Sequence, residues 1–269
     1  MTPSLRVATP RASLAAHVTG EGAPLLFVHG FPLDHTMWTH QIAALQGWRR
    51  IAPDLRGAGA SDVPDEGYSM ARYAEDLVAV LDVLGEARVV CCGLSMGAYI
   101  LFELLRRHPE RVRALILCDT KADADTPDGK RGRDELAALA EREGMAPVAE
   151  RLLPKLLGRT SRQRDPGLLQ AVRATVLRAP VAGVAGALRA MRDRPDSTPL
   201  LGALRVPTLL VGGAEDELTP AADMRAMADR VPAGRWVQID EAGHLAPLEQ
   251  PAQVNAAVGG FLAELGGAA

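Results

Sequence analysis

Ser95 lies inside the pentapeptide GLSMG (residues 93–97), and a serine in that setting can act as a nucleophile. The preceding residues 88–92 (RVVCC) are apolar and β-branched, which predicts a short buried strand. Residues 96–107 (MGAYILFELLRR) carry apolar side chains at helical spacing and lead into His-Pro, which predicts a helix that stops there. A strand, a sharp turn and a helix around G-x-S-x-G present the serine hydroxyl to a substrate. The alternative is an ordinary serine in a glycine-rich turn, unless the chain also supplies a base and an acid.

His244 is the predicted base. It follows a predicted strand at 235–239 (RWVQI) through a short turn that contains Gly243, and a C-terminal helical pattern comes after it. That position returns its imidazole to the sheet edge near Ser95. The other histidines lack this setting, and a lone histidine is usually a surface or structural residue: His17, His29, His35, His40 and His108.

Asp216 is the predicted acid. It lies in the turn GAEDELTP (213–220) after the predicted strand 206–211 (VPTLLV), at the sheet edge where open α/β proteins bind ligands. Asp119, just after the predicted strand 114–118 (ALILC), is the alternative, because that edge position also reaches a histidine. The carboxylates on either side of Asp216 are interpreted as solvated turn residues: Glu215 and Glu217.

A third feature could stabilise the negative charge that develops when a hydroxyl attacks a carbonyl. The sequence HGFP (29–32) follows a predicted strand, and the backbone amides of Phe31 and Met96 are the predicted oxyanion donors. Pro32 restricts Phe31 to extended conformations, which helps to fix the direction of its amide. His29 is interpreted as a brace for this loop.

Composition limits the remaining classes of function. The chain has 269 residues, of which 48% are hydrophobic and 23% charged, and a formal net charge of −3, so a nucleic-acid partner is not expected. No secretory signal or membrane-spanning run is recognisable, so no membrane partner is expected and the cytoplasm is the expected compartment. No cluster has metal-ligand spacing, so no metal or cofactor is expected, and the odd cysteine count argues against a disulfide framework: Cys91, Cys92 and Cys118.

Predicted strands and helices alternate in both halves of the chain, which predicts an α/β fold with a mostly parallel, twisted sheet and helices on both faces. Residues 121–199 interrupt this alternation with several short helices and no convincing strand. We therefore predict a core of residues 1–120 and 200–269 with an inserted helical cap at 121–199. A cap arginine is a candidate to bind a substrate carboxylate, with solvated helix faces as the alternative: Arg173, Arg178, Arg189 and Arg192.

These motifs resemble the α/β-hydrolase superfamily over nearly the whole chain, in the branch that contains carboxylesterases, cofactor-independent haloperoxidases and 3-oxoadipate enol-lactonase-like enzymes. The matching segments are HGF (29–31), PDLRGAGAS (53–61), GLSMG (93–97), GAEDELTP (213–220) and EAGH (241–244). One departure is Ala58, where many relatives carry histidine or phenylalanine, in a loop that we expect to be structural. The chain order Ser95, Asp216, His244 is the order of the triad on this fold.

The resemblance implies a serine hydrolase that cleaves carboxylic esters or lactones through an acyl-enzyme, with a small-molecule substrate as its partner. A serine at position 95 argues against epoxide hydrolases and haloalkane dehalogenases, whose nucleophile is aspartate. Acyl transfer to peroxide and carbon–carbon bond hydrolysis are alternatives on the same fold. A ligand-binding protein without catalysis is the alternative from a different class. The acyl chain, the leaving group and the oligomeric state are not predicted.

Overall fold

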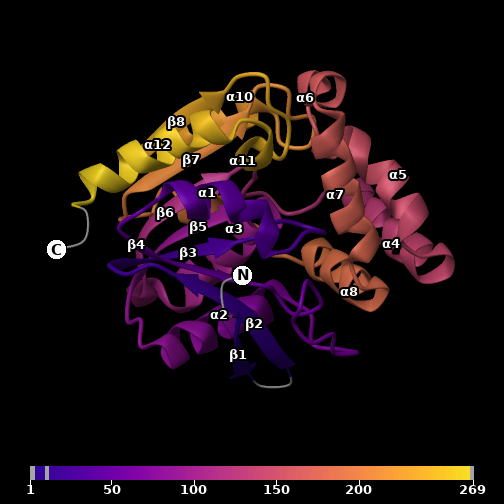
Figure 1. The fold of residues 1–269 in the computed structure, drawn as a ribbon, viewed down its shortest axis with the longest axis horizontal. Coiled ribbons are helices and arrows are strands. Elements are labelled where there is room, and N and C mark those ends of the chain that lie inside the picture. The colour runs from indigo at the N-terminus through magenta and orange to yellow at the C-terminus, as the bar shows by residue number, and fades with distance from the viewer. Residues whose placement is uncertain (1–3, 10–11, 267–269) are drawn as a thin grey trace.

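The computed structural model describes residues 4–9 and 12–266, and within them the strands form a single eight-stranded sheet (Figure 1). The strands run in the order β1-β2-β4-β3-β5-β6-β7-β8. Their bounds are β1 Ser4–Thr9, β2 Ala12–Thr19, β3 Ala23–Val28, β4 Trp48–Pro53, β5 Val89–Leu94, β6 Val112–Cys118, β7 Thr208–Gly213 and β8 Gly234–Ile239.

The sheet is parallel from β4 to β8, and only the first two strands run against their neighbours. β1 pairs with β2 and β2 with β4 in antiparallel register, while every other pair is parallel. Every residue of β5 and of β7 is buried, as expected for central parallel strands covered on both faces. The carboxyl ends of these parallel strands meet at one edge of the sheet, so the loops that follow them lie close together.

Helices of the core cover both faces of this sheet. In Figure 1, α1 and α12 pack together on one face, and α2 and α3 pack together on the other. The helices that follow the core strands are η1 His35–Trp38, α1 Thr39–Ala44, α2 Met70–Leu84, α3 Met96–Arg107, η2 Pro109–Arg111, α10 Ala221–Asp229, α11 Ala246–Glu249 and α12 Pro251–Glu264. The predicted α/β-hydrolase architecture is confirmed.

Six helices lie between β6 and β7, and most of them form a separate layer on one side of the core (Figure 1). They are α4 Pro127–Glu143, α5 Met145–Leu156, α6 Arg159–Arg164, α7 Pro166–Arg178, α8 Val181–Arg192 and α9 Thr198–Leu201. As predicted, the structure describes no strand in residues 121–199. The helix α8 packs against α4, and α5 packs against α7. We refer to residues 121–199 as the cap; its boundaries, and those of the core at 1–120 and 200–269, stay a prediction.

Candidate active site

Ser95 lies at the turn between β5 and α3 with a backbone conformation that side-chain-bearing residues rarely adopt. Its φ is 52° and its ψ is −112°. Its amide donates a hydrogen bond to the Cys118 carbonyl at 2.9 Å, which ties the turn to the end of β6. A Cβ at Gly97 would lie 2.2 Å from the Val28 carbonyl oxygen, so the helix can approach β3 only if this residue is glycine. The second glycine of the motif is therefore needed for close packing behind the strained serine.

The three residues predicted to react are joined by hydrogen bonds. His244 Nε2 lies 2.9 Å from Ser95 Oγ, and His244 Nδ1 lies 2.8 Å from Asp216 Oδ2. His244 and Asp216 are buried, whereas Ser95 is partly exposed. The arrangement allows the imidazole to accept the serine proton while the carboxylate holds the opposite ring nitrogen.

The loops that carry Asp216 and His244 contact each other through backbone. A Cβ at Gly213 would lie 2.1 Å from the Gly243 carbonyl oxygen, so only glycine lets these loops come this close. The amide of Ala214 also donates to the Ile239 carbonyl at 2.9 Å. This close packing fixes the position of the acid relative to the base.

Asp216 is held in its ionised form by its neighbours. Burial raises the pKa of this carboxyl, but His244 and hydrogen bonds from Thr219 outweigh burial and leave the pKa below its ordinary value. Its Oδ1 accepts hydrogen bonds from the amides of Leu218 at 2.8 Å and Thr219 at 3.1 Å. The carboxylate can therefore balance the charge of an imidazolium at position 244.

Asp119, the alternative acid, is placed differently. It is fully buried with a φ of 43°, and its Oδ1 accepts a hydrogen bond from the Gly213 amide at 2.8 Å. Its Oδ2 has no partner within the described residues. Burial, followed by the charge of Asp216, raises the pKa of Asp119 well above its ordinary value. The structure thus places Asp216, and not Asp119, against the imidazole of His244.

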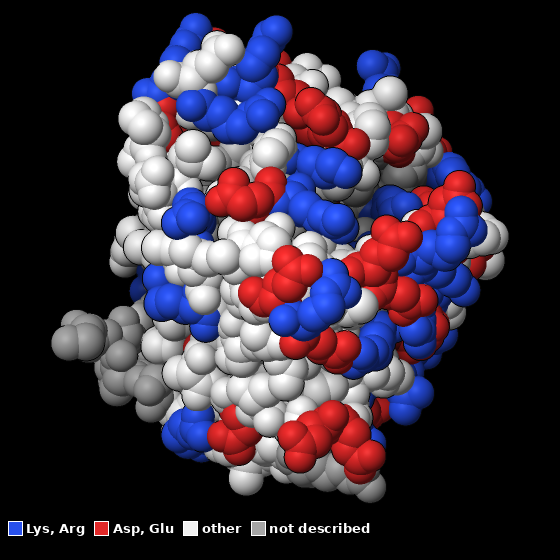
Figure 2. Space-filling model, turned by 90° about the vertical axis from the view of Figure 1, so that its right-hand side faces the viewer, with Lys and Arg blue, Asp and Glu red and all other residues white. Residues whose placement is uncertain are grey.

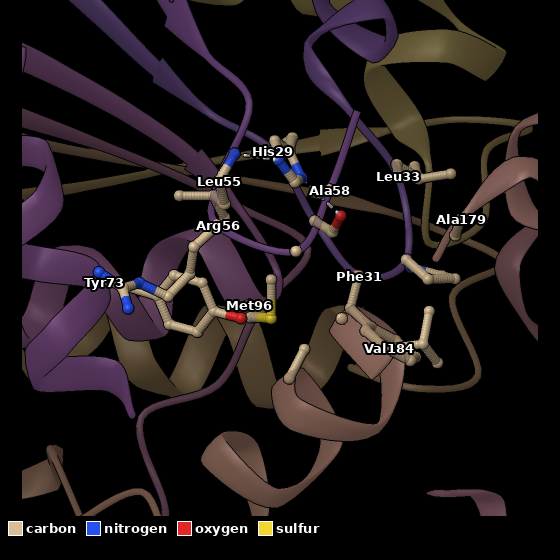
Figure 3. A pocket seen from close by; sticks show the side chains of 15 residues that line it. His29, Phe31, Leu33, Leu55, Arg56, Ala58, Tyr73, Met96, Ala179 and Val184 are labelled. Carbon is tan, nitrogen blue, oxygen red and sulfur yellow. Dashed lines mark hydrogen bonds between the residues drawn. The ribbon is translucent and has the colours of Figure 1, made fainter. Parts of the chain in front are cut away.

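The two predicted oxyanion amides are free to bind a ligand. Within the described residues, the amides of Phe31 and Met96 make no hydrogen bond. Met96 is the first residue of α3, where the helix dipole adds positive potential. His29 connects the Phe31 loop to the one after β4, because its Nε2 accepts a hydrogen bond from the Leu55 amide at 3.0 Å (Figure 3). Burial lowers the pKa of His29, in keeping with a neutral ring in this role.

Ala58, the departure noted in the sequence, lies in the wall of a small cavity. This apolar cavity is also lined by Phe31, Met96 and Val184, and Figure 3 shows it from close by. The expectation that this loop is structural stays a prediction.

Ser95 and His244 open into a cavity of about 380 Å³ between the core and the cap. Its apolar wall includes Leu136, Leu152 and Leu188 from the cap. Three cations also line it: Lys121, Arg133 and Lys155. The sequence analysis did not single out Arg133 and Lys155, because helical periodicity alone does not tell which face of a cap helix meets the core. Lys121 lies in a loop, where no periodicity applies.

The cap arginines that we considered for carboxylate binding lie elsewhere. None of the four lines the Ser95 cavity, and each has an acidic neighbour: Arg173 with Glu150, Arg178 with Asp34, Arg189 with Glu141, and Arg192 with Asp134 and Asp193. Figure 2, which looks onto the cap side, shows basic and acidic side chains interspersed over this face. These arginines belong to paired, solvated helix faces.

Two carboxylates connect the cap to the reactive loops, and the sequence analysis missed both. Glu215 was interpreted as solvated, but it accepts hydrogen bonds from the amide of Thr160 at 2.8 Å and from its hydroxyl at 2.6 Å. Glu249 accepts from the Gly158 amide with Oε2 at 2.8 Å, and from the Gly243 and Leu245 amides with Oε1 at 3.0 Å. These hydrogen bonds hold the start of α6 next to the loops that carry Asp216 and His244.

His17, His35 and Asp54 form a cluster that could in principle hold a metal ion. The cluster could not be predicted from the sequence, because its members come from three separate segments. Their nearest nitrogen and oxygen atoms lie within 4.8 Å of one another. However, the two imidazoles stack with centroids 3.4 Å apart and an angle of 13° between their planes. Ring nitrogens bind metals within the ring plane, so parallel rings do not aim at one ion. His35 Nδ1 instead lies 2.7 Å from Asp54 Oδ1, as a hydrogen-bonded pair.

The cysteines and the helices give two further findings. All three cysteines are buried and free. Within the described residues, no single helix has the length and apolar composition to cross a membrane, although α7 and α8 meet the criterion as a pair bent by 95°.

Comparison with known proteins gives the class of this protein. The α/β-hydrolase fold family matches residues 23–251, and the chain belongs to this family. Among solved structures, a thermophilic esterase from Thermogutta terrifontis with malate bound is 41% identical, with a TM-score of 0.95 over 98% of this chain and 99% of that one. The enol-lactonase from Burkholderia xenovorans LB400 is 28% identical, with a TM-score of 0.89 over 97% of this chain and 100% of that one. The curated 3-oxoadipate enol-lactonase 1 of Acinetobacter baylyi is 28% identical over 93% of both chains.

Proposed function

We propose that this chain hydrolyses carboxylic esters or lactones through an acyl-enzyme formed on Ser95. The observation that carries the proposal is the continuous hydrogen-bonded series from Ser95 Oγ through His244 to Asp216. The esterase and enol-lactonases to which the chain is similar support the same class of reaction.

In the first half of the reaction, Ser95 Oγ attacks the carbonyl carbon while His244 Nε2 takes its proton. The carbonyl oxygen becomes an oxyanion, and the amides of Phe31 and Met96 donate hydrogen bonds to it. Such donors each lower the barrier by about 3 to 4 kcal/mol in comparable sites. Asp216 stabilises the imidazolium that forms. The carbon–oxygen bond to the leaving group then breaks, and His244 returns the proton to the leaving alkoxide.

In the second half, His244 accepts a proton from water as that water attacks the acyl carbon. The bond to Ser95 Oγ breaks, the serine regains its proton from His244, and a carboxylic acid is released. An ester gives two products, whereas a lactone gives a single hydroxy acid because the leaving oxygen stays attached to the acyl chain. The same residues serve both substrates.

The proposal is tested with a panel of 4-nitrophenyl esters and lactones of graded chain length, together with a fluorophosphonate probe. We expect turnover of at least one member of the panel and covalent labelling of Ser95, located by peptide mass spectrometry. Labelling without any turnover would favour a ligand-binding protein, and labelling that persists in Ser95→Ala would place the nucleophile elsewhere. Hydrogen peroxide added to the assay tests the alternative of peracid formation, and ketone substrates, whose cleavage breaks a carbon–carbon bond, test the alternative of a carbon–carbon hydrolase.

A further inference from the structure

The cap side of the Ser95 cavity has an excess of positive charge close to the proposed reaction centre. Lys121, from the loop after β6, lines the cavity together with Arg133 of α4 and Lys155 of α5. No carboxylate is among the described residues that line it. The remainder of the wall is largely apolar, so these cations are the groups that could fix a polar end of a ligand.

Two of the three cations are partly neutralised by carboxylates that do not line the cavity. Asp125, whose side chain is 5% exposed, pairs with Arg133, with Lys121 at 3.8 Å and with Arg194 at 2.8 Å. Asp123 also pairs with Lys121 at 3.2 Å. Three cations therefore face two carboxylates in this group, which leaves an excess of one positive charge.

Lys155 is the cation without a carboxylate partner within the described residues. It is exposed and lies in the last turn of α5, where a cation also stabilises the helix dipole. Arginine supplies nearly all the positive charge of this chain, yet two of its three lysines line this one cavity. A lysine offers a mobile point charge with three donors, which suits a ligand group whose position varies.

We propose that the Ser95 cavity takes esters or lactones that carry a carboxylate group, and that Lys155 donates hydrogen bonds to that carboxylate. Arg133 and Lys121 add positive potential, and the leucine side chains of the cap contact the intervening hydrocarbon. The inference rests on the proposed hydrolysis at Ser95. It assigns substrate selection to the cap, whereas bond cleavage is assigned to the core.

The test compares two esters that differ only in charge: 4-nitrophenyl hydrogen glutarate and its methyl-capped analogue, 4-nitrophenyl methyl glutarate. The parent protein should favour the anionic ester by about 10-fold to 100-fold in kcat/KM, the range of a hydrogen bond between charged groups. Lys155→Gln should lose most of this preference through a higher KM and leave the neutral ester within about twofold. Lys130→Gln is the matched control, because Lys130 is an exposed lysine of α4 that does not line the cavity.

A second pair, 4-carboxyphenyl butyrate and its methyl ester, places the charge on the alcohol side. A preference for the anion in either pair that depends on Lys155 supports the proposal and shows which half of the substrate lies against the cap. Preference for the neutral member in both pairs, or an equal loss on both members in Lys155→Gln, would overturn it.

Binding of glutarate to Ser95→Ala protein, measured by calorimetry, separates this proposal from the proposed reaction. Binding that Lys155→Gln weakens by about tenfold or more supports the anionic subsite even if no ester is turned over. Turnover of neutral esters with no glutarate binding and no preference for the anionic esters would leave the hydrolase proposal intact and reject the subsite.

Discussion

On the core side of the Ser95 cavity, the groups that could react are held by backbone geometry, whereas on the cap side the wall consists of side chains on helices. The strained φ of Ser95 and the contact between Gly213 and Gly243 leave the core loops little freedom. The cap presents leucines and cations that could be exchanged without disturbing any strand. The difference indicates that bond cleavage and substrate choice can vary independently in this molecule.

We call the side of the cavity that carries Ser95 and His244 the core wall, and the side formed by the cap helices the cap wall. The largest expected effect comes from the core wall. Ser95→Ala should lower kcat by about 10⁴-fold to 10⁶-fold, because the members of a triad act as a unit. A matched change on the cap wall, Leu152→Ala, should leave kcat nearly unchanged and raise KM about fivefold, through the loss of partly buried apolar contact. Steady-state kinetics on the best neutral ester measures both. A Leu152→Ala variant whose kcat falls as far as that of Ser95→Ala would remove the distinction between the walls.

The next effect separates the two buried acids of the core. Asp216→Asn should lower kcat by about 10⁴-fold, because an amide neither stabilises the imidazolium nor holds the correct tautomer of His244. Asp119→Asn keeps an acceptor for the Gly213 amide and should change kcat by less than about tenfold. Circular dichroism controls for folding in both variants. If Asp119→Asn were the more severe, the acid would have to be reassigned to the end of β6.

The core wall could be predicted from the sequence because its signals are local. A glycine-flanked serine after an apolar run, and a carboxylate and a histidine after later strands, identify residues that a parallel sheet brings to one edge. The choice between Asp119 and Asp216 stayed open because both follow neighbouring strands. Only the direction of each side chain, which depends on tertiary packing, places one of them against His244.

The cap wall could be predicted only as a set of helices. Helical periodicity predicted the helices but not which face of each helix contacts the core. For this reason the sequence analysis considered arginines for a carboxylate that lie on the outer face of the cap. Glu215 was misinterpreted for a related reason: its partner Thr160 is 55 residues away, and nothing near Glu215 in the sequence signals that contact. Long-range pairing of this kind leaves no local pattern.

The connection between the walls gives the third prediction. Glu249→Gln should lower the free energy of unfolding by about 1 to 3 kcal/mol and kcat by about tenfold. An amide has one acceptor oxygen, so it cannot serve the Gly158 amide on one side and the Gly243 and Leu245 amides on the other. Glu217→Gln, an exposed carboxylate next to Asp216, is the control and should alter neither quantity. Urea unfolding and kcat at saturating substrate are the measurements, and equal behaviour of the two variants would mean that Glu249 does not position the His244 loop.

Acid should lower the free energy of unfolding through protonation of Asp54, which lies behind the Phe31 loop. Burial raises the pKa of Asp54, but hydrogen bonds from His35 and from the Ala60 amide outweigh it and lower the pKa from 3.8 to about 2. A carboxyl whose pKa is lowered by folding stabilises the protein above its unfolded pKa, and this contribution is lost as the pH falls from about 4 to 2. The shift corresponds to about 2 kcal/mol.

Asp54→Asn should therefore be about 2 kcal/mol less stable than the parent at pH 7, and the two stabilities should converge toward pH 2. The exposed Asp65→Asn is the control and should follow the parent at every pH. Urea midpoints measured across this range decide the matter. A difference between Asp54→Asn and parent that stayed constant down to pH 2 would show that the carboxylate charge is not what stabilises this loop.

The smallest expected effect concerns the outer face of the cap. Arg173→Gln removes a partly exposed arginine and Arg189→Gln an exposed one, and their partners, Glu150 and Glu141, are exposed. Such pairs contribute about 0 to 1 kcal/mol, because water screens the charges and ordering two long side chains costs entropy. Stability should change by less than about 1 kcal/mol, and kcat/KM for anionic esters should stay within about twofold. A large loss on anionic esters alone would show that substrate charge is sensed across the cap surface, and the boundary that we draw between its outer face and the Ser95 cavity would then be wrong.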